Sequence, residues 1–239
     1  MANDILQDIT DQIEDFSQKY GYKLGWRFLT CSKSILETNP KIVFINLNPR
    51  GRKQRPEHQF ISCENGSPYL CERWGDNRPG EDNLQIQIQK MFGKICEKTN
   101  YSGSNSAFIE VALSGYFVPF RSASLQDLEH EEEAFVFGEK LWSKILRSIQ
   151  PPELFVCIDR KTTKHVRKII ATTYNNLHEG KQCELETGWG NISAEIFEFG
   201  ETAKTRLLRL PHLSRFKLFT SEQCREKIDN IFTRFCRKT

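Results

Sequence analysis

Hydrophobic residues along the chain follow two spacings, one typical of amphipathic helices and one typical of buried strands. Apolar positions at helical spacing predict helices over residues 4–20, 81–98, 128–149, 160–175 and 221–236. Short apolar or alternating runs predict strands over residues 41–47, 106–113, 154–158, 194–199 and 205–210. Strands that alternate with helices in this way favour a mostly parallel sheet, because right-handed crossovers place the helices on its two faces.

We therefore expect an α/β fold, a three-layer α/β/α sandwich with a central, mostly parallel sheet of four to five strands. A chain of 239 residues can bury a sizeable core, and residues 1–239 are expected to form a single domain. Within it, residues 1–40 are expected to be an N-terminal helical extension. Residues 62–82, with several glycines and prolines, are expected to form a long loop of functional importance, and Trp74 argues against disorder there.

The distribution of charged residues along the chain is more informative about binding partners than the net charge, because 34 basic and 31 acidic residues nearly cancel. Basic residues cluster at 50–55 (RGRKQR), at 161–168 (KTTKHVRK) and at 204–217. These clusters lie close to predicted strand ends, where they are placed to contact phosphates. The acidic cluster at 126–133 opens a predicted helix.

The apolar runs are too short for a membrane helix, and the first twenty residues alternate acids with apolar residues. We expect neither a signal peptide nor a membrane partner. The eight cysteines are scattered without a closely spaced pair, which favours reduced thiols in a cytoplasmic protein.

Three polar segments follow predicted strands, at the sheet edge where α/β proteins carry their chemistry. In NLNPRG (46–51) the amide of Asn48 can orient water or a substrate oxygen, or it can simply start a turn. In GYFVPFRS (115–122) Arg121 can hold a phosphate or pack. In PHLSR (211–215) His212 can donate to a developing anion or be an ordinary surface or core histidine.

In this order and strand context, the three segments resemble the motifs of the uracil-DNA glycosylase-like superfamily, over roughly residues 41–215. NLNPRG matches the family's first motif, in which Asn-Pro follows an apolar strand, with Asn46 where the family's leading glycine stands. YFVPFRS matches its middle segment, and HLSR matches its last. Phe60, twelve residues beyond Asn48, looks like the aromatic residue that stacks on the extruded base.

The resemblance implies a monofunctional DNA N-glycosylase that extrudes a nucleotide, hydrolyses its glycosidic bond and leaves an abasic site. Asn48 and His212 would be catalytic, Asn48 by positioning water and His212 by stabilising charge on the departing base. The implied substrate-binding residues are Phe60, Tyr116, Asn46 and Pro49. The implied DNA-binding residues are Arg50, Arg52, Lys53, Arg55, Arg121, Lys161, Lys164, Ser214, Arg215 and Phe216.

This sequence differs from the motifs of the superfamily at three positions that affect which base is expected as the substrate. Tyr116 stands where many relatives have an asparagine that reads uracil, Leu213 replaces the proline of the last motif, and Arg50 directly follows Asn-Pro. We therefore expect a uracil-like or modified pyrimidine, including the modified bases of phage DNA, in a role in DNA repair or phage defence. The alternative is a nucleic-acid-binding protein on the same fold without catalysis.

DNA is the expected partner, and the sequence gives no reason to infer an obligatory protein partner. The spacing of Cys63 and Cys71 differs from that of the iron–sulfur branches of the superfamily, so we expect no cluster and no cofactor. His58, Cys63 and Cys71 supply only three zinc ligands at an unfamiliar spacing, so incidental thiols are favoured over a metal site.

Overall fold

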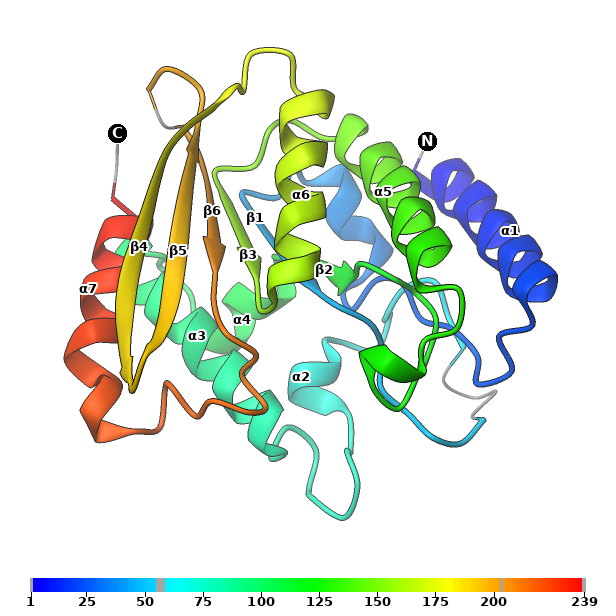
Figure 1. The fold of residues 1–239 in the computed structure, drawn as a ribbon, viewed down its shortest axis with the longest axis horizontal. Coiled ribbons are helices and arrows are strands. Elements are labelled where there is room, and N and C mark those ends of the chain that lie inside the picture. The colour runs from blue at the N-terminus through cyan, green and yellow to red at the C-terminus, as the bar shows by residue number, and fades with distance from the viewer. Residues whose placement is uncertain (1, 55–58, 203, 238–239) are drawn as a thin grey trace.

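The computed structural model of the chain, which describes residues 2–54, 59–202 and 204–237, has a six-stranded mixed sheet covered by helices (Figure 1). The spatial order of the strands is β2-β1-β3-β6-β5-β4. Their bounds are β1 Ile42–Asn46, β2 Leu113–Tyr116, β3 Leu154–Cys157, β4 Glu179–Trp189, β5 Ile192–Phe199 and β6 Thr205–Arg209. β2, β1, β3 and β6 are parallel to one another, whereas β5 and β4 extend the sheet in antiparallel pairs.

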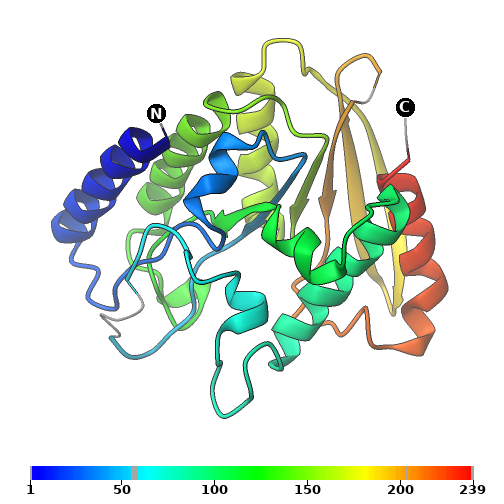
Figure 2. The same cartoon turned by 180° about the vertical axis from the view of Figure 1, so that it is seen from behind.

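Helices pack on both faces of the sheet because the strand residues alternate between two hydrophobic cores. In β1, Val43 and Ile45 face one core, while Ile42 and Phe44 face the other. The first core includes α1 (Ala2–Tyr20), α5 (Glu131–Arg147) and α6 (Arg160–Thr173). The second includes α3 (Asn83–Thr99), α4 (Asn105–Glu110) and α7 (Arg225–Phe235), as the view from behind also shows (Figure 2).

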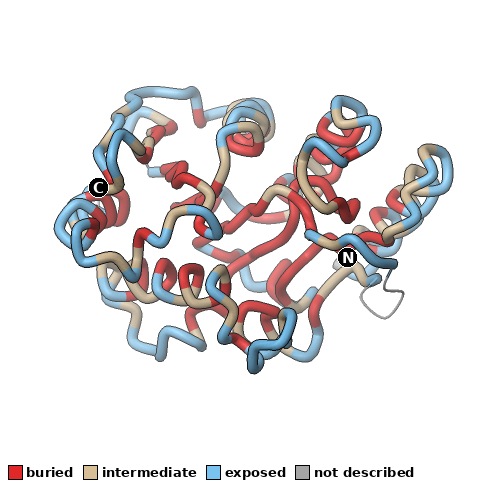
Figure 3. Tube along the Cα trace, turned by 60° about the horizontal axis from the view of Figure 1, so that its bottom comes forward, coloured by how far each residue is buried: buried red, intermediate tan, exposed pale blue. Residues whose placement is uncertain are grey.

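Burial follows this layered arrangement (Figure 3). Every residue of β1, β2, β3 and β6 is buried, whereas the edge strand β4 is largely exposed. Continuous burial of this kind is typical of strands covered on both faces. The expectation of an α/β fold is therefore confirmed.

The expected sheet of four to five mostly parallel strands is wrong in strand number and in direction, because β4 and β5 form an antiparallel hairpin at one edge. β4 was not predicted, since its charged and polar residues lack a continuous apolar pattern.

The predicted strand at 106–113 is also wrong. Residues 105–110 form α4, whose N-cap Ser104 accepts a hydrogen bond from the amide of Ala107 at 3.1 Å, and the strand begins only at Leu113. A short apolar run fits a buried helix turn as well as a strand.

The segment after α1 lies along the outer edge of β2. Thr30 N donates to Ser114 O at 2.8 Å, and Tyr116 N donates to Phe28 O at 2.8 Å. These bonds bring the neighbouring Arg27 to the carboxyl end of β2, where its amide donates to Pro119 O at 2.9 Å. Part of the expected N-terminal extension is therefore integrated into the sheet edge.

The long loop over residues 62–82 contains one short helix, α2 (Pro68–Cys71). No helix within the described ranges has the length and apolar character needed to cross a membrane. All eight cysteines lie in described positions, and each is a free thiol.

Candidate active site

A cavity of about 720 Å³ opens at the carboxyl ends of β1, β2 and β6. Its volume is in the range of small-molecule sites, and its place is where parallel α/β sheets bind ligands. All three sequence segments that follow these strands reach it. The predicted site residues in its lining are Asn46, Asn48, Pro49, Arg50, Arg52, Lys53, Tyr116, Arg121, His212 and Ser214.

Asn48 is fixed by the loop that follows β2. The two loops pair beyond the strand ends, since Val118 N donates to Leu47 O at 2.9 Å. Within this pairing, Asn48 Nδ2 donates to Phe120 O at 3.1 Å and to Ser122 Oγ at 2.8 Å. Both donor hydrogens are used, so the amide orientation is set and Oδ1 is left to accept from a molecule in the cavity. Asn48 is only 7% exposed, which makes this orientation rigid.

His212 follows β6 and is held by the turn that it starts. Its Nδ1 lies 3.3 Å from the amide of Ser214, which donates to it, and 2.7 Å from Ser214 Oγ. Because Nδ1 accepts, the proton of the neutral ring is on Nε2. Burial, together with the charges of Arg50 and Arg215, lowers the pKa of His212 to about 4. His212 is therefore a neutral hydrogen-bond donor at physiological pH.

Tyr116 and Asn46 form the floor of the cavity at the ends of β2 and β1. Burial raises the pKa of Tyr116, so its phenol stays protonated. Asn46 Oδ1 accepts from the amide of Leu47 at 2.8 Å. The side chains of the floor are thus uncharged and polar.

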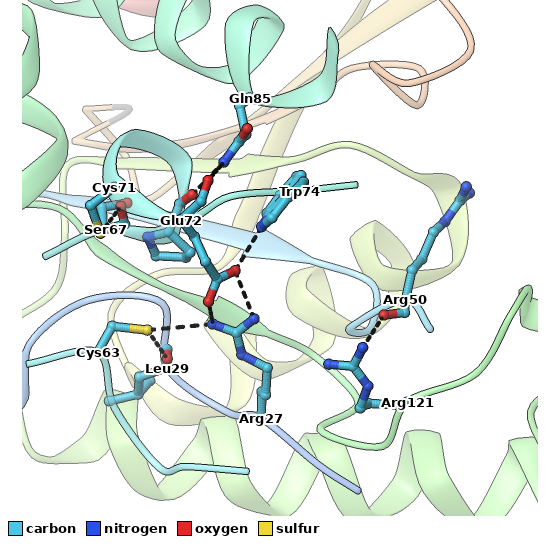
Figure 4. A network of polar contacts seen from close by, with 11 residues as sticks. Arg27, Leu29, Arg50, Cys63, Ser67, Cys71, Glu72, Trp74, Gln85 and Arg121 are labelled. Carbon is cyan, nitrogen blue, oxygen red and sulfur yellow. Dashed lines mark hydrogen bonds and ion pairs between the residues drawn. The ribbon is translucent and has the colours of Figure 1, made fainter. Parts of the chain in front are cut away.

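One wall of the cavity contains a charge pair that the sequence interpretation missed (Figure 4). Arg27 is only 3% exposed, and its guanidinium forms a bidentate ion pair with the Glu72 carboxylate, with N–O distances of 3.0 and 2.9 Å. Trp74 Nε1 donates to Glu72 Oε2 at 2.6 Å. Charge-assisted bonds of this geometry are strong and directional, so the three side chains are a preorganised unit.

The rim of the cavity is basic. Arg50, Arg52, Lys53 and Arg73 line it and are exposed. Four exposed cations around one opening favour the approach of an anionic ligand.

Arg121 is buried and has a structural part in this rim. Its Nη2 donates to Arg50 O at 2.8 Å, which ties the two strand-end loops together (Figure 4). Its guanidinium passes so close to Gly51 that a Cβ at that position would overlap it. Any larger residue after Arg50 would therefore require the Arg121 guanidinium to shift.

Other predicted residues lie outside the cavity lining. The ring of Phe60 is covered by the Arg27 guanidinium, whose Cζ is 4.4 Å from the ring centroid. Lys161 forms an ion pair with Glu131 and lies over the ring of Phe135, while Lys164 is exposed on α6. These positions do not bring Phe60 or the lysines of α6 to the cavity.

Arg215 and Phe216 follow His212 but do not line the cavity either. Arg215 is exposed, and Phe216 packs edge-on against Trp189 with ring centroids 6.3 Å apart. Leu213, between the two cavity residues of this turn, is fully buried in the second core. Arg55 and His58 lie outside the described residues.

Arg27, Glu72, Arg73 and Trp74 are the main cavity residues absent from the sequence predictions. The sequence around Arg27 does indicate a buried ion pair. Arg27 is the one charged residue of the apolar segment WRFL, and an arginine is almost never fully buried without a partner. The partner lies 45 residues away in a loop, and no periodicity connects them.

Among the described residues, no cluster of three or more His, Cys, Asp or Glu side chains is arranged to hold a metal ion. Cys63 and Cys71 are separately engaged: Cys63 lies 3.9 Å from Arg27 Nη2, and Cys71 Sγ donates to Ser67 O at 3.1 Å. In comparisons with known proteins, no family model and no curated protein matches the chain.

Proposed function

We propose that the protein is a DNA glycosylase that hydrolyses the N-glycosidic bond of an extruded uracil-like or modified pyrimidine and leaves an abasic site. The single observation that carries this proposal is that Asn48 and His212, from different strand ends, line one cavity in complementary hydrogen-bonding states. Asn48 presents an acceptor, its Oδ1, and His212 presents a donor, its Nε2–H. Hydrolysis of this bond needs both, an acceptor for the attacking water and a donor for the departing base.

Asn48 would position the water. Its amide has no useful pKa, so it cannot act as a general base. Its anchored Nδ2 leaves Oδ1 as an acceptor that can hold one water hydrogen and turn the oxygen lone pair toward the sugar carbon. As the bond between C1′ of the sugar and the base nitrogen breaks, the sugar gains oxocarbenium character, so a weak, well-placed water can bond to C1′. The proton that this water loses passes to the departing pyrimidine anion, and the products are a neutral base and an abasic sugar.

His212 would stabilise the leaving base. The pyrimidine gains negative charge on its carbonyl oxygen as the bond breaks, and the neutral Nε2–H of His212 is a donor of matching chemistry. The nearby cations Arg50 and Arg215, which lower the pKa of His212, also favour an anion in the cavity. The same charges therefore keep His212 neutral and stabilise the departing anion.

The basic rim would hold the DNA backbone around the extruded nucleotide. Arg52, Lys53 and Arg73, which line the cavity, would contact the flanking phosphates. Extrusion costs a few kcal/mol in lost stacking and pairing, and contacts to the phosphates and base offset this cost. Two acidic residues, Glu72 and Asp82, also line the cavity. Glu72 is paired with Arg27, and Asp82 caps α3 by accepting from the amide of Leu84.

A base-release panel tests the proposal. Single- and double-stranded oligonucleotides with uracil, hydroxymethylated, glucosylated or other altered pyrimidines are incubated with the protein and treated with alkali. We expect strand cleavage at one class of altered pyrimidine, and cleavage at least about a hundredfold slower with the Asn48→Ala variant.

Retained DNA binding without release from any substrate of the panel would instead support the non-catalytic alternative. The exposed cations of the rim and Tyr116, which replaces the uracil-reading amide, are the observations that favour that alternative. The panel therefore separates the two functions with one readout.

A further inference from the structure

We propose that Trp74, rather than Phe60, is the aromatic side chain against which the extruded pyrimidine stacks. This inference rests on the proposed function, and it assigns to the long loop at residues 62–82 a role in binding the base. Base–aromatic stacking is a general way to hold an unstacked nucleotide, because every base has a π face.

Phe60 is poorly placed for this role. The Arg27 guanidinium lies over its ring, with Cζ 4.4 Å from the centroid, and Arg27 rather than Phe60 lines the cavity. Arg27 is itself held by Glu72. A base could reach that face of Phe60 only if a buried ion pair were displaced, and breaking such a pair is costly.

Trp74 is partly exposed and, unlike Phe60, lines the cavity. The aromatic residues in the described cavity lining are Tyr116 and Trp74, and of these Tyr116 is buried whereas Trp74 is partly exposed. The indole of Trp74 packs edge-on against Tyr69, with ring centroids 6.0 Å apart and an interplanar angle of 75°. An edge-on contact covers at most one face of the indole, so Tyr69 leaves the other face available.

The indole is held in place before any ligand binds. Its Nε1 donates to Glu72 Oε2 at 2.6 Å, and the Glu72 carboxylate is fixed by Arg27 (Figure 4). Trp74 O accepts from the amide of Asn77 at 3.3 Å and from Asn77 Nδ2 at 3.2 Å, which closes the turn after it. A residue whose indole N–H and backbone carbonyl are both bonded loses little conformational freedom on stacking.

The loop around Trp74 is rigid although it is mostly irregular, because two glutamines of α3 clamp it. Gln85 Nε2 donates to Pro68 O at 2.7 Å and to Glu72 O at 2.8 Å. Gln89 Nε2 donates to Tyr69 O and to Gly80 O, both at 2.7 Å. Buried side-chain amides that satisfy loop carbonyls replace the bonds of regular structure. The loop thus presents Trp74 as a fixed wall of the cavity.

A binding experiment that does not depend on catalysis tests this inference. Two single-stranded probes of equal length are compared, one with a central pyrimidine from the panel and one with a tetrahydrofuran abasic site at that position. Both carry the same phosphates, so the ratio of their affinities isolates the base contact. Anisotropy gives the affinities of the wild type and of Trp74→Leu, Trp74→Phe and Phe60→Leu, and tryptophan fluorescence reports stacking directly.

We expect Trp74→Leu to lower the preference for the base-bearing probe by about 5- to 150-fold, the range that corresponds to one lost stack. Affinity for the abasic probe should stay unchanged, which also shows that the variant is folded. Trp74→Phe keeps a flat ring and should recover part of the preference. Phe60→Leu should change it by less than about threefold.

The base-bearing probe should quench the fluorescence of the wild type and of Trp189→Phe, a control that removes a tryptophan outside the cavity. The quench should be absent in Trp74→Phe. A quench that persists in Trp74→Phe, or a preference lost in Phe60→Leu and kept in Trp74→Leu, overturns the inference. Base-dependent quenching at Trp74 without base release from any substrate would refute the glycosylase proposal and leave the stacking assignment standing.

Discussion

Lowering the pH probes the environment that the fold gives to His212. Burial and the charges of Arg50 and Arg215 lower the pKa of His212 from 6.5 to about 4 in the folded protein. The unfolded chain therefore binds a proton at this residue as the pH falls below about 6.5, while the folded protein binds it only near 4. Because the unfolded state gains the proton first, His212 makes the folded protein less stable as the pH falls through this window.

The magnitude follows from the same two values. A fall from 6.5 to about 4 corresponds to about 3 kcal/mol at most. The His212 side chain is partly exposed, so solvent screening reduces this figure, and we expect about 1–2 kcal/mol. That is a large part of the free energy of unfolding of a typical domain.

Urea unfolding of the wild type and of His212→Gln at pH 7 and pH 4.5 measures this contribution. Glutamine does not titrate, and all other titrating groups are common to the two proteins. The free energy of unfolding of the wild type should therefore fall by about 1–2 kcal/mol more than that of the variant between the two pH values. An equal fall in both proteins would mean that His212 titrates as it does in water, and the lowered pKa that we assign to its buried environment would be refuted.

Three further predictions concern catalysis, DNA binding and packing. Asn48→Ala should slow base release by about 10²–10³-fold in single-turnover assays with little change in DNA affinity, because the water contact acts mainly in the transition state; a near-normal rate would remove Asn48 from the site. Arg52→Gln and Lys53→Gln should each reduce the log–log salt slope of duplex binding by about 0.9, whereas an unchanged slope would mean that these cations are merely solvated. Gly115→Ala should lower the free energy of unfolding by about 1–3 kcal/mol in chemical denaturation, since its Cβ would lie 2.7 Å from Phe28 O; the control Gly180→Ala, whose nearest neighbour is 3.4 Å away, should be within about 0.5 kcal/mol of the wild type.

The central strands could be predicted from sequence because burial on both faces leaves a continuous apolar run. β1 and β3 were recognised in this way within one or two residues of their ends, and β6 was recognised although Arg206 and Arg209 interrupt its apolar residues. β4 could not be, because it is an edge strand whose outward residues are charged and whose stability comes from pairing with β5. The helix over 105–110 was misread because Phe108 and Ile109 are buried side by side, a pattern that fits either structure.

The part of the site carried by strand ends was predictable for a related reason. Residues that follow parallel strands meet at one edge, so the segments with Asn48, Tyr116 and His212 were expected to converge, and the structure brings all three to one cavity. The wall made by Arg27, Glu72 and Trp74 was not predictable. It depends on a loop that is folded by glutamine contacts to its backbone, and such contacts leave no periodic pattern in the sequence.

The central claim is that the cavity releases a pyrimidine base from DNA by hydrolysis, and mass spectrometry of the products tests it most directly. Oligonucleotides of the panel are incubated with the wild type and with the Asn48→Ala/His212→Ala double variant under single-turnover conditions. The account predicts a free altered pyrimidine and an intact strand with one abasic site from the wild type, and at least about a hundredfold slower release from the double variant. Equal release by both proteins, or no free base from any substrate that the wild type binds, would contradict it.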